Sequence, residues 1–212
     1  LTSAQQRVLK EIQHDLKQPH PMQRLVQGDV GSGKTVIAAL AAIQAADAGF
    51  QVAVMAPTEI LAEQHLNAFL EWLEPLNIEV AWLNGRMKAA EKRYQLAQIA
   101  NGEAKVIIGT HALFQEAVEF HKLGLVIIDE QHRFGVHQRL ALHEKNNDEN
   151  VHTHQLIMTA TPIPRTLAMT AYGDLDLSVI DELPPGRKPI ETAVLLSLIH
   201  ISETTRPLHI SY

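Results

Sequence analysis

The eight residues Gly28-Asp29-Val30-Gly31-Ser32-Gly33-Lys34-Thr35 satisfy the pattern G-x-x-x-x-G-K-[ST] at every specified position. Glycines in such a loop let successive backbone N–H groups turn toward a bound anion, because no side chain blocks the approach. Lys34 supplies positive charge for the β- and γ-phosphates of a nucleotide, and the hydroxyl of Thr35 is a ligand for Mg²⁺. The stretch therefore predicts a phosphate-binding loop.

The residues around this loop have the order strand, loop, helix that phosphate binding requires. The apolar segment Leu25-Val26-Gln27 precedes the loop, and an alanine-rich helical pattern runs from Thr35 to Ala48. A phosphate in the loop would lie at a helix N-terminus, where unpaired N–H groups and the helix dipole favour negative charge. A glycine-rich surface turn is the alternative, but the flanking strand and helix favour a nucleotide site.

The composition is that of a globular domain with a sizeable core. The chain has 212 residues, of which 46% are hydrophobic and 20% are charged. It contains no cysteine, so disulfides and thiolate metal sites are excluded. No apolar run approaches the roughly 18 residues of a membrane span, and the first residues lack the layout of a signal peptide. These features predict a cytoplasmic protein with no membrane partner.

The charge balance limits how this chain could bind nucleic acid. The net charge is −6 with histidine neutral, and aromatic residues make up 5% of the chain. A nucleic acid would therefore be held by a local surface rather than by a basic field or an aromatic stacking platform. His152 and His154 lie beside a polar stretch, and no H-E-x-x-H pattern accompanies them. We interpret these histidines as solvated or locally hydrogen-bonded side chains rather than as metal ligands.

Short apolar runs alternate with helical patterns, which predicts β-α-β units and a parallel sheet covered by helices on both faces. Ser3 is expected to cap the first helix, and residues 183–189 have the composition of a linker. The expected strands are Arg24–Gln27, Gln51–Ala56, Val80–Leu83, Lys105–Gly109, Leu125–Asp129 and Gln155–Thr159. The expected helices are Ser3–Lys17, Thr35–Ala48, Ile60–Leu73, Ala89–Ala100, His137–Glu144 and Pro164–Ala171.

Polar residues follow five of the expected strands, at the sheet edge where open α/β folds bind ligands. Asp129 and Glu130 come directly after the apolar run Leu125–Ile128. In a phosphate-loop enzyme an acid at this place holds Mg²⁺, and a neighbouring glutamate can polarise the attacking water as general base. We therefore expect Asp129 on the metal side and Glu130 as the base. The other polar groups begin at Gly28, Pro57, Thr110 and Thr159.

The phosphate loop, the D-E-Q-H string at 129–132 and the T-A-T string at 159–161, in this order, resemble the first motor domain of superfamily 2 DExH helicases. The strings Q-H-R-F-G-V at 131–136 and T-P-I-P-R-T at 161–166 resemble more narrowly the RecG family of branched-DNA helicases. They resemble the transcription-repair coupling factors less closely. The resemblance runs from Leu1 to about Leu195 and implies a RecA-like P-loop NTPase domain that uses ATP and Mg²⁺.

The resemblance also implies roles for individual residues. Gln5 would bond the adenine edge, with Arg7 in support, and residues 28–35 would hold the triphosphate and the metal. The residues that link the nucleotide state to the grip on DNA would be His132, Thr159, Ala160 and Thr161. The DNA path would be lined by Pro57, Thr58, Thr110 and His111. Arg165 would either join this path or cap a helix.

A motor of this class binds ATP between two such domains, and the second domain supplies arginine fingers. No Q-x-x-G-R-x-G-R pattern follows Thr192, and the branch-point wedge domain of the RecG family would precede Leu1. We therefore expect an ATP-binding domain over residues 1–196, weakly active by itself, and a non-native tail over residues 197–212. Its partners would be branched or forked DNA, the second motor domain and the wedge domain.

Two other classes of protein use a phosphate loop. A small-molecule kinase would need an acceptor pocket and a lid, whereas this chain has Gly109-Thr110-His111 and the T-A-T string at the sheet edge. A non-catalytic nucleotide-gated module would be favoured by the loss of Lys34 or Glu130, and both are present. The sequence therefore favours a helicase motor, and the resemblance to the RecG family implies fork regression and branch migration in recombination and repair.

Overall fold

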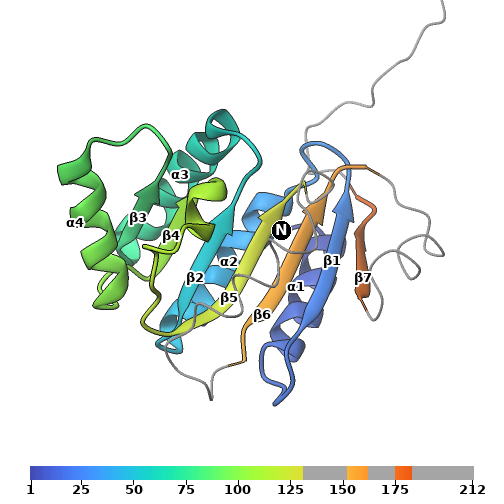
Figure 1. Ribbon diagram of the computed structural model, residues 1–212. Coiled ribbons are helices and arrows are strands. Elements are labelled where there is room, and N and C mark those ends of the chain that lie inside the picture. The colour runs from blue at the N-terminus through green and yellow to red at the C-terminus, as the bar shows by residue number, and fades with distance from the viewer. Residues whose placement is uncertain (131–151, 162–174, 183–212) are drawn as a thin grey trace, which may run out of the picture.

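The computed structural model describes residues 1–130, 152–161 and 175–182 (Figure 1). The described helices are α1 (Ser3–Asp15), α2 (Lys34–Asp47), α3 (Glu59–Leu73) and α4 (Ala89–Ala100), with the short 3₁₀ helices η1 (Glu74–Leu76) and η2 (His111–Phe114). The described strands are β1 (Gln23–Gly28), β2 (Gln51–Met55), β3 (Val80–Leu83), β4 (Val106–Gly109), β5 (Leu123–Asp129), β6 (His154–Thr159) and β7 (Asp176–Ile180).

These strands form one 7-stranded sheet in the order β3-β4-β2-β5-β6-β1-β7. Every adjacent pair is parallel, and helices lie on both faces, which confirms the predicted fold class (Figure 1). The six expected strands and the first four expected helices form to within two residues at each end. The expected helices at 137–144 and 164–171, the linker at 183–189 and the tail at 197–212 lie outside the described residues.

The register of the central strands brings the polar loops together. Gln27 at the end of β1 pairs with Thr159 at the end of β6, and Asp129 at the end of β5 pairs with Met158. The chain segments that follow β1, β5 and β6 therefore leave the sheet side by side. This is the arrangement that parallel β-α-β topology produces at the carboxyl edge of a sheet.

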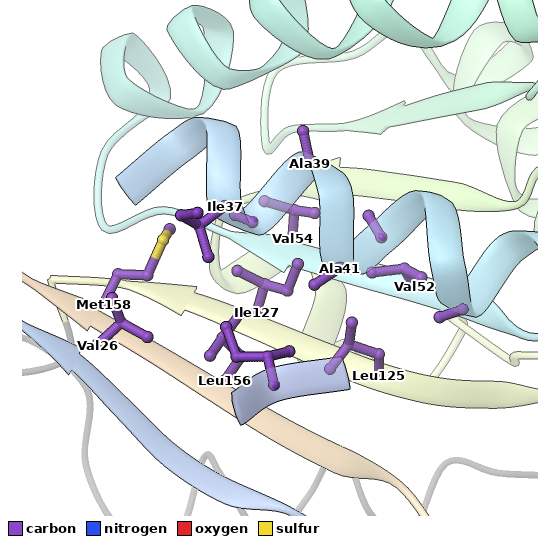
Figure 2. Packing of buried hydrophobic residues seen from close by; sticks show 14 of the residues in the cluster. Val26, Ile37, Ala39, Ala41, Val52, Val54, Leu125, Ile127, Leu156 and Met158 are labelled. Carbon is purple, nitrogen blue, oxygen red and sulfur yellow. The ribbon is translucent and has the colours of Figure 1, made fainter. Parts of the chain in front are cut away.

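The larger core lies between the sheet and helices α1, α2 and α3. Helix α2 is rich in buried alanines, whose small side chains let it pack closely on branched strand residues. Burying each large aliphatic side chain contributes about 1.5–3 kcal/mol. Figure 2 shows Ile37 and Ala41 of α2 facing the strands, and Ala39 on the other side of the helix. The labelled strand residues of this cluster are Val26, Val52, Val54, Leu125, Ile127, Leu156 and Met158.

The opposite face of the sheet carries a second core. Met55, Ile107 and Ile128 of the strands pack there with Leu113 of η2 and Ile99 of α4. Strands that are buried on both faces explain the nearly continuous apolar runs in the sequence. Within the described residues, no helix combines the length and apolar character that crossing a bilayer requires.

The N-terminus of α1 corrects one sequence expectation. Thr2 caps this helix, because its hydroxyl accepts from the backbone N–H of Gln5 (3.2 Å) while the Gln5 side chain accepts from the Thr2 N–H (2.9 Å). This reciprocal capping box satisfies two helix-end donors. Ser3 is instead the first helical residue, and its hydroxyl donates to Glu182 (2.8 Å).

Strand β7 was not expected from the sequence. It pairs with β1 at the edge of the sheet, and its register begins at the pair Arg24 and Asp176. Arg24 donates to Ser178 of β7 (2.8 Å) and to Asp15 of α1 (2.7 Å), and Arg7 donates to the carbonyl of Val179 (2.9 Å). The contacts of Arg24 and Arg7 with β7 span more than 150 residues of sequence, so no local pattern contains them.

Candidate nucleotide-binding site

The phosphate loop connects β1 to α2 and owes its shape to two glycines. Gly31 (φ 76°) and Gly33 (φ 91°) adopt left-handed backbone conformations that other residues rarely take. A Cβ atom on Gly33 would also lie 2.2 Å from Nε2 of Gln5. Gly33 is the N-cap of α2, so the loop delivers the unpaired N–H groups of that helix to the sheet edge.

Lys34 extends into this loop. Its ammonium group donates to the carbonyls of Gly28 and Asp29, the latter at 3.0 Å. Burial lowers the pKa of Lys34 below its usual range, although Asp129, Glu130 and Asp29 oppose the shift. The positive charge of Lys34 therefore interacts electrostatically with Asp129 and Glu130, the two acidic residues of the predicted site.

Ser32 and Gln5 complete the wall behind the loop. The Ser32 hydroxyl is buried and has no hydrogen-bond partner among the described residues. Gln5 is buried, and its amide nitrogen donates to the carbonyl of Ser32 (2.8 Å) while its oxygen is engaged by Thr2. The predicted adenine contact of Gln5 would thus require its amide to turn away from the loop. Arg7, expected beside Gln5, is held by Asp181 (2.9 Å) at the end of β7.

Asp129 and Glu130 lie at the carboxyl end of β5, on the same sheet edge as the loop and separated from β1 by the intervening strand β6. Glu130 has a φ of +50°, an uncommon conformation for a residue with a side chain, of a kind that concentrates at functional sites. Its backbone N–H donates to Met158 O (2.9 Å), and its Oε1 accepts from the N–H of Ala160 (3.1 Å). The predicted base is therefore joined directly to the T-A-T segment that follows β6.

This T-A-T segment is itself ordered by a short-range bond. Thr159 is buried, and its hydroxyl accepts from the N–H of Thr161 (3.1 Å). Glu130 and the three residues 159–161 therefore form one connected unit at the sheet edge. His132 and Arg165, to which the sequence also assigned roles, lie outside the described residues.

Asp129 has a partner that the sequence did not identify. Oδ2 of Asp129 lies 2.8 Å from Nε2 of His65, a buried residue of α3. The available signal was helical periodicity, because Ala62, His65, Phe69 and Leu73 form the buried face of α3. A histidine on that face indicates a polar partner in the core, but nothing in the sequence identifies the partner as Asp129.

The residues predicted for the DNA path gather after β2 and β4. The backbone of Ala56 donates to Gly109 O (3.1 Å), so the two loops begin side by side. Thr58 caps α3 by accepting from the N–H of Leu61 (3.3 Å), and both Pro57 and Thr58 are half-buried. Thr110 is buried and His111 is exposed, so the structure presents only the second of this pair at the surface.

The oxygen atoms near the loop suit a Mg²⁺ ion that is bound partly by substrate phosphates, rather than a metal bound by protein ligands alone. Among the described residues, no group of three or more His, Cys, Asp or Glu side chains is arranged to hold a metal ion. Mg²⁺ prefers hard oxygen ligands and is usually bound by one or two carboxylates together with substrate phosphates. Thr35 and Asp129 offer oxygens of this kind, and the buried Ser32 hydroxyl and the ammonium of Lys34 suit a phosphate.

A parallel α/β sheet that carries a phosphate loop after one strand and an acidic pair after another, with one strand between them, defines the RecA-like class of P-loop NTPase domains. The sequence profile of DEAD/DEAH box helicases matches residues 2–170, and the chain belongs to this family.

The relatives within the family are named more specifically. The chain is 64% identical over 194 residues to "ATP-dependent DNA helicase RecG" of Escherichia coli K12, and 63% identical to the protein of that name from Haemophilus influenzae. Each alignment covers 92% of this chain and 28% of the relative. The chain therefore spans just over a quarter of the length of these relatives. The resemblance to the RecG family expected from residues 131–136 and 161–166 is confirmed.

Solved structures agree with this assignment. A structure titled "Structure of RecG bound to three-way DNA junction" matches with a TM-score of 0.78 and 49% identity, covering 90% of this chain and 25% of that one. The yeast DEAD-box splicing factor Prp28 matches with a TM-score of 0.64 and 17% identity over 85% of this chain and 45% of its own. At that identity, the second match supports the fold alone.

Proposed function

We propose that residues 1–196 are the ATP-binding domain of an ATP-dependent DNA helicase that acts on branched DNA. In this proposal ATP hydrolysis drives movement along duplex DNA, and so fork regression and branch migration in recombination and repair. The observation that carries the proposal is the meeting of the phosphate loop, Asp129-Glu130 and the T-A-T segment at the ends of β1, β5 and β6. The names of relatives above 60% identity support an ATP-dependent DNA helicase, and the 49% identical structure of RecG bound to a three-way DNA junction supports branched DNA as the substrate.

The residues at the sheet edge divide the chemistry of hydrolysis between them. Residues 28–35 bind the triphosphate through backbone N–H groups, and Lys34 compensates its negative charge. Thr35 and Asp129 would hold Mg²⁺, which would supply positive charge to compensate the triphosphate. Glu130 accepts the proton of a water that attacks the γ-phosphorus, while the bond to the β–γ bridging oxygen breaks and ADP and phosphate leave.

The hydrogen bond from Ala160 N–H to Glu130 supports a coupling role for the T-A-T segment. A movement of the Glu130 side chain during hydrolysis would be transmitted directly to residues 159–161 through this hydrogen bond. We assign the same role to His132, and we place the DNA path along Pro57, Thr58, Thr110 and His111. Backbone and hydroxyl groups contact phosphates without reading sequence, which explains how an acidic domain holds DNA.

This domain requires further parts of a longer protein. The share of the relatives' length that this chain spans supports a second motor domain and a wedge domain as partners. We further propose that residues 197–212 are a non-native tail. A cytoplasmic location fits a DNA-processing enzyme without cysteine. The match to a helicase family over residues 2–170 also favours this function over a small-molecule kinase.

A chimaera tests the proposal directly. Residues 1–196 replace the matching segment of E. coli K12 RecG, and the purified chimaera is assayed for ATP hydrolysis and unwinding of a three-way junction. We expect junction-stimulated hydrolysis, its loss in Lys34→Ala, and ATP binding without turnover in Glu130→Gln. A chimaera that binds ATP and junction DNA but hydrolyses at a rate indifferent to DNA, or phosphorylates a small acceptor, would refute the proposed function.

A further inference from the structure

We propose that His65 is a positioning residue that holds the carboxylate of Asp129 in place for Mg²⁺. Its Nε2 lies 2.8 Å from Oδ2 of Asp129, and the two side chains are 7% and 14% exposed. The inference rests on the proposed function, because it concerns the same nucleotide site. The proposal adds to this site a residue of α3, which contains neither the phosphate loop nor the acidic pair.

The chemistry of this contact has one direction. A carboxylate only accepts hydrogen bonds, so the imidazole ring donates through Nε2. With Oδ2 held, the carboxyl group cannot rotate freely about its last bond. Carboxylates that ligate metals are commonly oriented in this way by outer-shell donors.

The imidazole ring is itself fixed by its surroundings. The ring of Phe69 packs edge-on against it, with centroids 6.5 Å apart and an interplanar angle of 85°. Ala62 and Leu73, on the same face of α3, are fully buried, and Leu73 belongs to the larger core. The donor therefore belongs to a rigid element, which is a requirement for orienting a ligand accurately.

A buried histidine can also serve packing alone, and the two roles make different predictions. A packing residue affects the fold, and with it every mode of nucleotide binding. A positioning residue for Asp129 affects the part of the affinity that depends on Mg²⁺. Measuring the affinity for ATP both in Mg²⁺ and in EDTA therefore distinguishes a packing role of His65 from a positioning role.

The experiment uses the 212-residue chain and a fluorescent ribose-labelled ATP derivative, titrated in Mg²⁺ and in EDTA. We expect His65→Leu to reduce the gain in affinity conferred by Mg²⁺ by about 10-fold to 100-fold. Its affinity in EDTA should stay within about twofold of the unmodified chain, because the loop is unchanged. His65→Gln, which keeps a side-chain donor, should recover most of the gain. Thermal unfolding of each variant is measured in parallel.

Leu73→Ala is the matched control, because it loosens the same buried face of α3 without removing the donor to Asp129 or the ring of Phe69. It should lower the melting temperature and leave the effect of Mg²⁺ intact. If His65→Leu does not fold, His65→Phe keeps an aromatic ring against Phe69 and also lacks the donor.

The outcomes separate the inference from the proposed function. Equal weakening in Mg²⁺ and EDTA, or no recovery in a folded His65→Gln, overturns the role of His65 alone. Nucleotide binding that is unaffected by Lys34→Ala, or absent from the unmodified chain, contradicts the proposed function and the inference with it.

Discussion

The side chain of Gln51, at the start of β2, is the subject of the most detailed prediction. Its Nε2 donates to the carbonyls of Ile99 and Ala104, both at 2.8 Å. Its Oε1 accepts from the N–H groups of His121 (2.8 Å) and Lys122 (3.1 Å). The side chain is 1% exposed, so one buried amide joins the end of α4, the start of β4 and the start of β5.

Replacing Gln51 by methionine keeps the length of the side chain and removes all four hydrogen bonds. The carbonyl of Ile99 retains a bond from Gly102 N–H (3.1 Å), whereas the carbonyl of the buried Ala104 loses the amide donor. Leaving one buried acceptor unsatisfied costs about 1–3 kcal/mol, and each of the other lost bonds costs about 0.5–1.5 kcal/mol. Burial of the thioether offsets part of this loss, by roughly 1 kcal/mol.

The expected decrease in the free energy of unfolding is therefore about 2–6 kcal/mol. For a domain of this size this corresponds to a fall in melting temperature of roughly 5–25 °C. Urea and thermal unfolding of the 212-residue chain, followed by circular dichroism, measure both quantities. Unchanged m-values would show that the denatured state is not the cause.

The same substitution at Gln44 provides the control. Its Oε1 is buried on α2 without a hydrogen-bond partner among the described residues. Gln44→Met therefore removes no bond and buries one polar atom fewer, so stability should be unchanged or slightly raised. If Gln51→Met and Gln44→Met change the free energy of unfolding equally, the reasoning from hydrogen bonds is refuted.

Two further predictions concern the phosphate loop and the opposite edge of the sheet. Gly33→Ala should weaken ATP binding at least 10-fold, because the left-handed backbone and the contact with Gln5 both exclude a Cβ atom. Titration with a labelled nucleotide measures the affinity, and an unchanged affinity would contradict the prediction. Burial lowers the pKa of His154, whose Nδ1 accepts from Met22 N–H (2.9 Å), so the native state binds fewer protons than the unfolded state below pH 6.5. The free energy of unfolding should therefore fall as the pH drops from 6.5 toward the lowered pKa. Urea unfolding at several pH values should show a smaller fall in His154→Gln than in the unmodified chain. Equal pH dependence in the two proteins would exclude His154 as the cause.

The sequence predicted most of the fold because the signals were local. Apolar runs of strand length and helical periodicity occur within single segments, and segments such as Val80–Leu83 and Ala89–Ala100 match their expected bounds. Strand β7 was missed because its partners on α1 and β1 are remote in sequence. The capping box at Thr2 and Gln5 had a readable T-x-x-Q pattern, but Ser3 was preferred as the cap.

In the candidate site, too, the features written in consecutive residues were predicted from the sequence, whereas contacts between distant segments were not. The phosphate loop could be read from eight consecutive residues, because its shape depends on backbone freedom at Gly31 and Gly33 and on the adjoining helix. The pairing of Glu130 with Ala160 follows from the adjacency of β5 and β6, which strand order alone decides. The position of Gln5 against Ser32 likewise depends on how α1 packs beside the loop.

The sequence by itself determined the strand–loop–helix unit, the acidic pair after β5 and the RecG-like class of motor, because each is written in consecutive residues. Only the tertiary structure decided that His65 contacts Asp129, 64 residues further along the chain. It also decided that the amide of Gln5 rests on the loop. The physical reason is that a turn depends on the conformational preferences of neighbouring residues, whereas a contact between distant side chains depends on the order and register of the strands that bring them together.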